Sequence, residues 1–471
     1  MPLWSKPATE LAAAVRAGEV SALDVTDSHL DRIAEVNPEL NAVTQLLADR
    51  AREAARDTDR RRAAGEPLGP LAGVPFTVKE STPIAGVPTT FGTPHFRDHI
   101  AVADAVPVAR LRAAGAIPIG HSNLPTLVIA GMHTRSELYG DTRNPWDSRR
   151  TPGGTSGGDG VAVAAGMAPL ALGNDSGGSV RIPASFCGIA ALNPTTGRFP
   201  ADQRVIGPAD PGPASQVLVT DGPLARTVAD LRLAYEALAG TDPRDPRAVP
   251  VPLYGEPLDG PIRIAVVADP GGHGVHPTVR RAIAEAADAL SDAGYDVQEV
   301  PDVPRLDEAL ETYHRLPVTE FAPRWPAVRQ LLGEGGDRYI DYTMRAAPPA
   351  TDAPGLMDLL SARMGVRRAW AEFLRQYPLL LGPVFSEPPV EPRLESRDQA
   401  GRDRVALAMR LCSASTLAGV PAVAVPTGLD PDGLPTGVQL VGRAFREDLC
   451  LDAAQAVEDH CGTLAPIDPK R

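Results

Sequence analysis

Length, charge and cysteine content exclude several classes of protein for this chain. Its 471 residues allow a large hydrophobic core, and a net charge of −13 argues against nucleic acids and anionic membranes as partners. The four cysteines make no disulfide framework, and no stretch reaches the roughly 20 apolar residues of a membrane span. Because the N-terminus carries no recognisable signal peptide, we expect the chain in the cytoplasm.

The N-terminal segment predicts helices. Apolar side chains recur at helical spacing over residues 8–60, which indicates two or three helices. Ser21 and Asp24 predict a capping box at the start of the second helix.

Lys79 is unusual among the basic residues of the chain. The sequence has 46 lysines and arginines, yet Lys79 is the only lysine between Lys6 and Lys470. Arginine supplies positive charge equally well, but only a desolvated lysine loses its proton at ordinary pH. Lys79 is therefore a candidate base, although a lysine that merely escaped replacement would leave the same pattern.

A cluster rich in glycine and serine covers residues 151–188. Glycine pairs flank Thr155 and Ser156, and another pair precedes Ser179. Glycines at this density let backbone N–H groups approach a reacting group. Between the two loops, residues 161–172 predict a buried helix that leads into a short strand and brings the loops together. Hydroxyls, consecutive N–H groups and a distant lysine are the parts needed for acyl transfer.

The second half of the chain predicts alternating strands and helices. Residues 261–269 and 295–300 are strand-like, and residues 276–294 between them have helical periodicity, which indicates a β-α-β unit. This unit lacks the pattern Gly-x-Gly-x-x-Gly, so we interpret it as scaffold and not as a nucleotide site. Residues 422–426 and 438–442 predict further buried strands.

Several blocks of this sequence resemble the amidase signature family. The family hallmark is a Gly-Gly-Ser-Ser-Gly-Gly loop followed by a second Gly-Gly-Ser, and this chain has GGTSGG and GGS. LAGVPFTVKE, LYGDTRNPWD and VPAVAVPTGLDPDGLPTGVQLVG match further blocks in the family's order. The match spans about residues 8–458, with core motifs at about 60–220 and 410–460. It implies an α/β fold with a single large mixed β-sheet covered by helices on both faces.

The resemblance implies a catalytic triad with one departure from the family pattern. Ser179 matches the nucleophile and Lys79 the base, whereas Thr155 stands where the family has a relay serine held by a cis peptide bond. We expect the threonine hydroxyl to relay protons as serine does. Two alternatives stay open: Ser156 takes over part of the relay, or the triad is impaired and the chain is a binding protein.

The resemblance also implies the groups that stabilise the reaction. It places the oxyanion hole on backbone N–H groups of the nucleophile loop, which are those of Ser176, Gly177, Gly178 and Ser179. Asp175 and Arg181 flank this loop and are expected to hold it through hydrogen bonds, the alternative being an ordinary surface pair.

A second pattern in the same loop points to a different nucleophile. Residues 154–158 fit Gly-x-Ser-x-Gly, the nucleophile elbow of α/β-hydrolases, with Ser156 as the nucleophile. An elbow must join a strand to a helix, and the proline- and arginine-rich segment before it does not resemble a strand. We therefore favour Ser179.

The expected function is hydrolysis of a carboxylic amide to an acid and ammonia or an amine. The chain would act on a small-molecule amide, with no cofactor, metal, nucleic acid or membrane involved, and a homodimer is left open. Aromatic residues concentrated at about 300–400 favour an aryl or alkyl substrate, although core packing explains them equally well. The main alternative is an amidotransferase-type subunit that works with partner chains.

The chain is expected to form one domain over residues 1–471. Proline-rich pieces at 242–261 and 347–355 predict loops and not linkers between domains. The resemblance implies that the variable region at about 300–400, together with segment 121–140, builds the substrate pocket.

Overall fold

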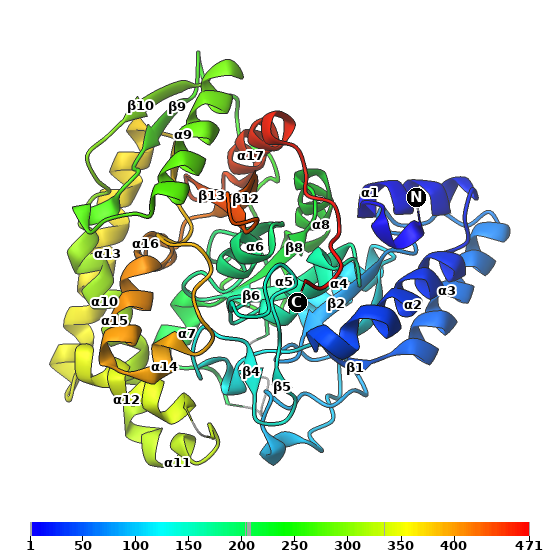
Figure 1. Ribbon diagram of the computed structural model, residues 1–471, viewed down its shortest axis with the longest axis horizontal. Helices are drawn as coiled ribbons and strands as arrows, with labels where there is room; N and C mark the ends of the chain where they lie inside the picture. Colours follow the sequence, from blue (N-terminus) through cyan, green and yellow to red (C-terminus); the bar gives the residue numbers. More distant parts are fainter. Residues whose placement is uncertain (1, 203, 205–208, 334, 471) are drawn as a thin grey trace.

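One mixed β-sheet runs through the molecule, with helices packed around it (Figure 1). The computed structural model describes residues 2–202, 204, 209–333 and 335–470. Within these ranges eleven strands form the sheet, in the spatial order β1 (Val43–Leu46), β3 (Ile117–Ser122), β2 (Pro75–Lys79), β6 (Leu170–Asp175), β8 (Thr220–Ala225), β7 (Ala190–Asn193), β12 (Ala422–Leu429), β13 (Pro435–Gly442), β11 (Leu379–Pro383), β9 (Arg263–Val266) and β10 (Asp296–Glu299). A separate hairpin consists of β4 (Arg135–Ser136) and β5 (Gly140–Asp141).

The helices lie in groups around this sheet. One group, at the right of Figure 1, contains α1 (Ala8–Ala17), α2 (Ala22–Leu40) and α3 (Ala48–Ala63). At the left lie α10 (Leu306–Phe321), α11 (Trp325–Arg329), α12 (Gly336–Ala346), α13 (Ala353–Gln376), α14 (Leu394–Arg397), α15 (Gln399–Ala408) and α16 (Arg410–Ala418). The others are α4 (Val106–Ala113), α5 (Gly157–Ala164), α6 (Arg181–Cys187), α7 (Pro213–Leu218), α8 (Val228–Leu238), α9 (Pro277–Asp292) and α17 (Glu447–Cys461). No helix in the described ranges is both long and apolar enough to span a membrane.

Both faces of the sheet are buried. Successive side chains of a strand point to opposite faces, so neighbouring residues of one strand show what covers each face. In β9, Ile264 and Val266 belong to one hydrophobic core, together with residues of α9 and α17. Ala265 of the same strand and Val267, which directly follows it, belong to a second core, with residues of α10, α13 and α16. Helices therefore cover the sheet on both faces, and the predicted α/β class with one large mixed sheet is confirmed.

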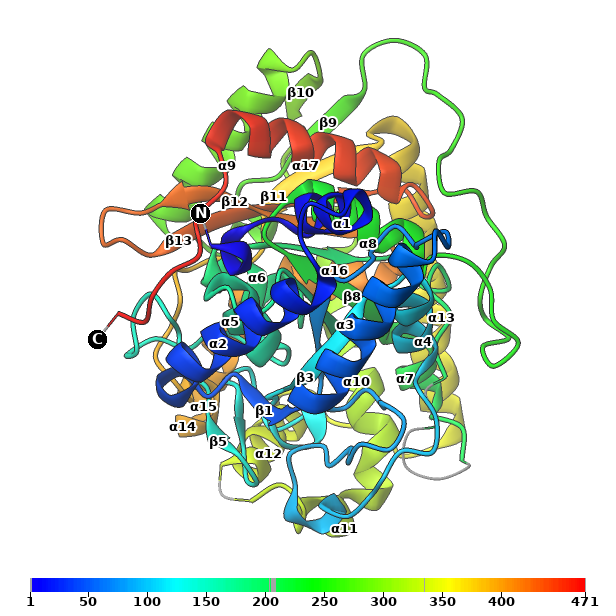
Figure 2. The same ribbon diagram turned by 90° about the vertical axis from the view of Figure 1, so that its right-hand side faces the viewer.

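The N-terminal predictions hold with one addition. Three helices occupy residues 8–63, and the Ser21 hydroxyl accepts a hydrogen bond from the Asp24 N–H at 2.9 Å as the expected cap of α2. The strand β1 follows α2, pairs antiparallel with β3 and was not predicted. Figure 2 shows α2 and α3 side by side over this edge of the sheet.

The strand and helix predictions of the later segments are also confirmed, with one boundary wrong. The β-α-β unit exists as β9, α9 and β10, and β9 and β10 are parallel neighbours. The loop predicted for 347–355 ends early, because α13 begins at Ala353. Asp352 caps α13 by accepting the Gly355 N–H at 2.9 Å, and Pro354 fits the first turn, where no N–H is needed.

Candidate active site

Three central strands bring the predicted catalytic segments to one end of the sheet. Lys79 is the last residue of β2, Asp175 the last of β6 and Thr220 the first of β8. Since β6 lies between β2 and β8, parallel to the former and antiparallel to the latter, these three ends coincide. In α/β proteins, ligands bind at this end of the sheet, just outside the carboxyl ends of the parallel strands.

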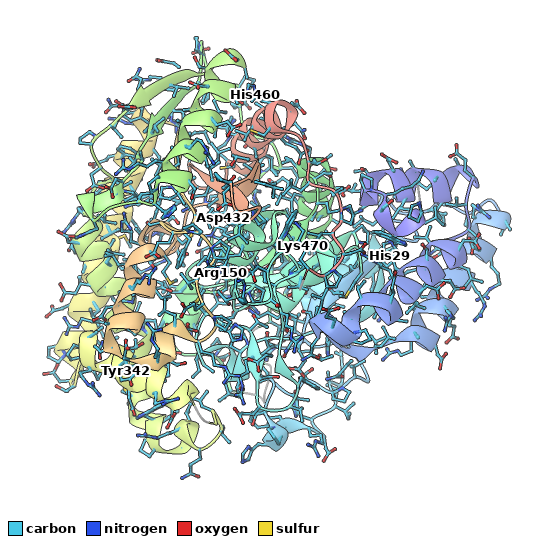
Figure 3. All side chains as sticks on the ribbon, in the orientation of Figure 1. His29, Arg150, Tyr342, Asp432, His460 and Lys470 are labelled. Atoms are coloured by element: carbon cyan, nitrogen blue, oxygen red, sulfur yellow. The ribbon has the colours of Figure 1, made fainter. Side chains whose placement is uncertain are left out.

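Lys79 is fully buried and faces the glycine-rich cluster. Its Nζ lies 2.5 Å from Thr155 Oγ1 and 2.7 Å from Asn174 Oδ1. Burial lowers the pKa of Lys79 to about 7, although the carboxylates of Asp159, Asp175 and Asp221 act in the opposite direction. The two other lysines lie near the surface: Lys6 is beside Glu10, and Lys470, which is labelled in Figure 3, lies over the Trp146 ring. Only Lys79 occupies a setting that favours a neutral amine.

Thr155 and Ser156 have different surroundings. The bond Gly154–Thr155 is a cis peptide, and the Thr155 side chain lines a cavity. Ser156 is fully buried, and its hydroxyl donates to the Asn174 carbonyl at 3.2 Å. Of these two adjacent hydroxyls, the one on Thr155 contacts Lys79 and the one on Ser156 is engaged by the backbone.

A backbone hydrogen bond ties the two glycine-rich loops together. The Ser156 N–H donates to the Ser179 carbonyl at 3.0 Å, which brings the relay position and the predicted nucleophile into one loop pair. This bond joins the start of α5 to the turn between β6 and α6. The predicted helix and strand between the two loops are present as α5 and β6, so the sequence correctly placed the loops together.

The nucleophile loop is organised by the buried carboxylate of Asp175. It accepts the N–H groups of Gly177 at 3.0 Å, Gly178 at 2.6 Å and Val180 at 3.1 Å, and it forms an ion pair with Arg181 at 3.0 Å. Burial acts to raise the pKa of Asp175, but Arg181 and the N–H donors outweigh it and lower the pKa to about 2. Asp175 and Arg181 therefore form an internal pair that holds the loop, and the alternative of a surface pair is wrong.

The predicted oxyanion donors do not have equal surroundings. The N–H groups of Gly177 and Gly178 point to Asp175, whereas Asp175 accepts no hydrogen bond from Ser176 or Ser179 among the described contacts. Ser176, Gly177 and Ser179 line the cavity.

A cavity of about 520 Å³ opens beside this loop. Both Ser179 and Thr155 line it, and much of its wall is apolar, with the side chains of Phe91, Ile129, Met132, Leu218, Phe321 and Met409. A cavity of this kind, mostly apolar with a few polar groups near the reacting atoms, is typical of small-molecule sites.

The aromatic residues of the variable region divide between the cavity and the core. Tyr313, Phe321 and Tyr339 line the cavity, whereas Trp370 is fully buried in the second core. Tyr342 lies on α12, outside the cavity wall (Figure 3). Pocket lining therefore explains some aromatic residues of the variable region, and core packing explains others.

Histidine does not complete the alternative nucleophile elbow. The segment before Ser156 is not a strand, so the strand-turn-helix context of the elbow is missing. His314 lines the cavity, and burial lowers its pKa to about 3, but no described hydrogen bond joins it to Ser156.

Sequence reasoning missed two polar residues of this site, Asn174 and Asp221, and it counted Tyr313 only among the aromatic residues of the variable region. Asn174 accepts a hydrogen bond from Lys79, Tyr313 places its hydroxyl against Gly177, and Asp221 lines the cavity from β8. Asn174 lies close to Ser176 in the chain, which is a weak local signal. Tyr313 and Asp221 are distant in sequence, and no motif marks them.

Comparison with known proteins places the chain in a family. The pattern of the family described as Amidase matches residues 24–451. An indoleacetamide hydrolase from Bradyrhizobium diazoefficiens is 41% identical over 468 aligned residues, and the match covers 98% of this chain and 88% of that protein. A glutamyl-tRNA(Gln) amidotransferase subunit from Salinispora tropica is 35% identical over 501 residues, covering 98% of this chain and 99% of that protein.

Solved structures show the same architecture. The crystal structure of a bacterial aryl acylamidase of the amidase signature family superposes with a TM-score of 0.84 at 27% identity, covering 98% of this chain and 97% of that one. Its description, the family description and the name of the indoleacetamide hydrolase agree with a hydrolase that acts on carbon–nitrogen bonds. With its large mixed sheet and its match over most of the length, this chain belongs to the amidase signature family and is an amide hydrolase.

Proposed function

We propose that Ser179 is the nucleophile, Thr155 the proton relay and Lys79 the base of this amidase. The observation that carries the proposal is the 2.5 Å distance between Lys79 Nζ and Thr155 Oγ1 in a buried setting. A serine hydroxyl is a weak nucleophile until a base takes its proton, and a lysine that burial keeps neutral is such a base. Ser156, whose hydroxyl is bonded to a backbone carbonyl, holds the loop and does not relay.

The proposed reaction has two halves. In the first, Ser179 Oγ bonds to the amide carbonyl carbon while its proton passes to Thr155, and the Thr155 proton passes to Lys79. The backbone N–H groups of Ser176 and Ser179, from which Asp175 accepts no hydrogen bond among the described contacts, stabilise the oxyanion, and one such donor contributes roughly 3–4 kcal/mol. The carbon–nitrogen bond then breaks, and the nitrogen leaves with the proton that returns through the relay. In the second half, water releases the acid from Ser179 through the same relay.

The substrate class that the cavity supports is an uncharged amide with an apolar, aromatic acyl group. The lining is largely apolar, and in the described ranges no lysine or arginine contributes to it. A relative at 41% identity bears the name indoleacetamide hydrolase. Indole-3-acetamide is therefore the first probe, with indole-3-acetic acid and ammonia as the expected products.

The test combines covalent labelling with turnover. Intact-protein mass after treatment with a fluorophosphonate should show one adduct on the wild type and none on Ser179→Ala. The wild type should also release ammonia from indole-3-acetamide, and the variant should not. An adduct on Ser179→Ala, or amide turnover by it, would move the nucleophile to another residue.

A second candidate function rests on the amidotransferase relatives. At 35% identity over almost their full length, they leave open a role as one subunit of an assembly that transfers ammonia. We favour an enzyme that acts without partner chains, as a single domain in the cytoplasm and without nucleic acid. Ammonia release by the purified chain alone supports this, whereas activity that requires added partner subunits supports the second candidate. Size-exclusion chromatography with light scattering decides between a monomer and a homodimer.

A further inference from the structure

Asp221 lies directly beside the proposed proton relay. In the sheet, Asp221 of β8 pairs with Asn174 of β6, the residue that accepts a hydrogen bond from Lys79. Directly opposed residues of antiparallel strands place their side chains on the same face, about 5 Å apart at Cβ. Asp221 lines the same cavity as Ser179 and Thr155. Its carboxyl group is therefore next to the reacting end of the cavity.

The Asp221 carboxyl differs from the two other acidic groups of the cavity wall. Asp202 forms an ion pair with Arg204 at 2.9 Å, and Glu320 accepts hydrogen bonds from the Ala214 N–H at 2.6 Å and the Ser215 hydroxyl at 2.8 Å. For Asp221, the described part of the chain supplies neither a hydrogen bond nor an ion pair. Within the described residues this group is therefore an acceptor that a ligand in the cavity can reach.

The setting of Asp221 favours a hydrogen-bond donor in the cavity. Burial raises the pKa of Asp221 to about 7, and the charges of Lys79 and Arg247 act to lower it. The side chain is partly exposed, and it faces the cavity, so a substrate N–H can take the place of water as its hydrogen-bond donor.

The chemistry of the leaving group identifies that donor. In the proposed function, on which this inference rests, the leaving nitrogen takes its proton through Thr155. It must therefore lie on the side of the site where Thr155, Asn174 and Asp221 are found. An amide nitrogen carries an N–H, whereas the leaving oxygen of an ester carries none.

We infer that the Asp221 carboxylate accepts a hydrogen bond from the leaving-group N–H of the amide substrate. This contact orients the nitrogen for protonation and makes Asp221 a residue that favours amides over esters of the same acid. Hydrogen bonds to a charged group are strong enough for an effect of about 10- to 100-fold on the amide reaction.

The test compares an amide with the ester of the same acid. For Asp221→Ala, kcat/KM for indole-3-acetamide should fall about 10- to 100-fold relative to the wild type, while that for methyl indole-3-acetate should stay within about twofold. For Asp221→Asn, which keeps an acceptor oxygen, kcat/KM for indole-3-acetamide should lie between the values of the wild type and Asp221→Ala. Asp202→Ala removes a different carboxyl of the cavity wall and should leave the amide-to-ester ratio unchanged, whatever it does to each rate.

Several outcomes would overturn the inference. The inference is wrong if Asp221→Ala lowers kcat/KM for the amide and the ester equally. It is also wrong if Asp202→Ala changes the amide-to-ester ratio as strongly as Asp221→Ala does. The rate of fluorophosphonate labelling checks the fold of the site, since it should be similar in Asp221→Ala and the wild type. A wild type that hydrolyses neither compound and forms no adduct overturns the proposed function, and this inference with it. A wild type that hydrolyses both with an unchanged ratio in Asp221→Ala overturns the inference alone.

Discussion

Lys79 Nζ lies 2.5 Å from Thr155 Oγ1, and neither residue is more than 7% exposed. The threonine methyl therefore does not turn the hydroxyl away from the amine. Because hydroxyl and amine are in hydrogen-bond contact, a proton can pass between them without a bridging water. The replacement of a relay serine by threonine is compatible with the triad that we propose.

Replacing the lysine should abolish the reaction even where positive charge is kept. Lys79→Arg leaves a cation that cannot lose its proton, so kcat should fall by about 10²–10⁴-fold, the usual contribution of general base catalysis. Lys79→Met, of similar length and without charge, should be equally inactive. Turnover of indole-3-acetamide at pH 8 measures both variants. An arginine variant within tenfold of the wild type would show that Lys79 does not titrate in the reaction.

The pH dependence should follow the buried lysine. The base must be neutral, and burial lowers its pKa from the ordinary 10.5 to about 7. Below about pH 7, kcat/KM should therefore fall tenfold per unit, and above it the rate should level off. The charge of Asp159 acts to raise the pKa of Lys79, so Asp159→Asn should move the break to lower pH. A pH-rate profile of each protein measures this, and a break near 10 in the wild type would contradict it.

The relay hydroxyl can be tested with two substitutions at one position. Thr155→Ser keeps the hydroxyl and should retain or raise activity, whereas Thr155→Val keeps the shape, removes the hydroxyl and should lower kcat by about 10²-fold or more. Ser156→Ala is the matched control from the same loop and should cost less than Thr155→Val. Steady-state kinetics and fluorophosphonate labelling rates measure all three. If Ser156→Ala has the larger effect, Ser156 and not Thr155 relays the proton.

Gly177 should be intolerant of any side chain. A Cβ at this position would lie 1.8 Å from the Tyr313 hydroxyl, so Gly177→Ala must displace either the nucleophile loop or the Tyr313 side chain. We expect a loss of activity of about 10²-fold, comparable with the loss of an oxyanion donor. Tyr313→Ala removes the obstruction, and the double variant should recover part of the lost kcat. If Tyr313→Ala gives no recovery, the loss has another cause.

The parts of this site that the sequence predicted are those carried by short motifs. The glycine pairs around Thr155 and before Ser179 indicated two backbone loops that approach a reacting group, and the apolar segment between them indicated that they meet. Lys79 was noticeable because almost every other basic residue is arginine. The fold class followed from the alternation of strands and helices and from the family resemblance. Local chemistry and periodicity are sufficient for inferences of this kind.

The composition of the cavity could not be predicted, because it depends on strand order and helix packing. Asp221 reaches the site only because β8 pairs antiparallel with β6, and Tyr313 only because α10 packs against the nucleophile loop. A motif search had no reason to choose Tyr313 over Trp370, which lies in the core.

By itself, then, the sequence determined which residues have the chemistry for acyl transfer and which loops carry them. Only the tertiary structure decided that Lys79 is buried against Thr155 rather than Ser156, and that Asp175 and Arg181 form an internal pair. It also decided which carboxyl of the cavity wall has no partner among the described residues. The physical reason is that desolvation and hydrogen-bond pairing depend on the neighbours that folding brings together, and these lie far apart along the chain.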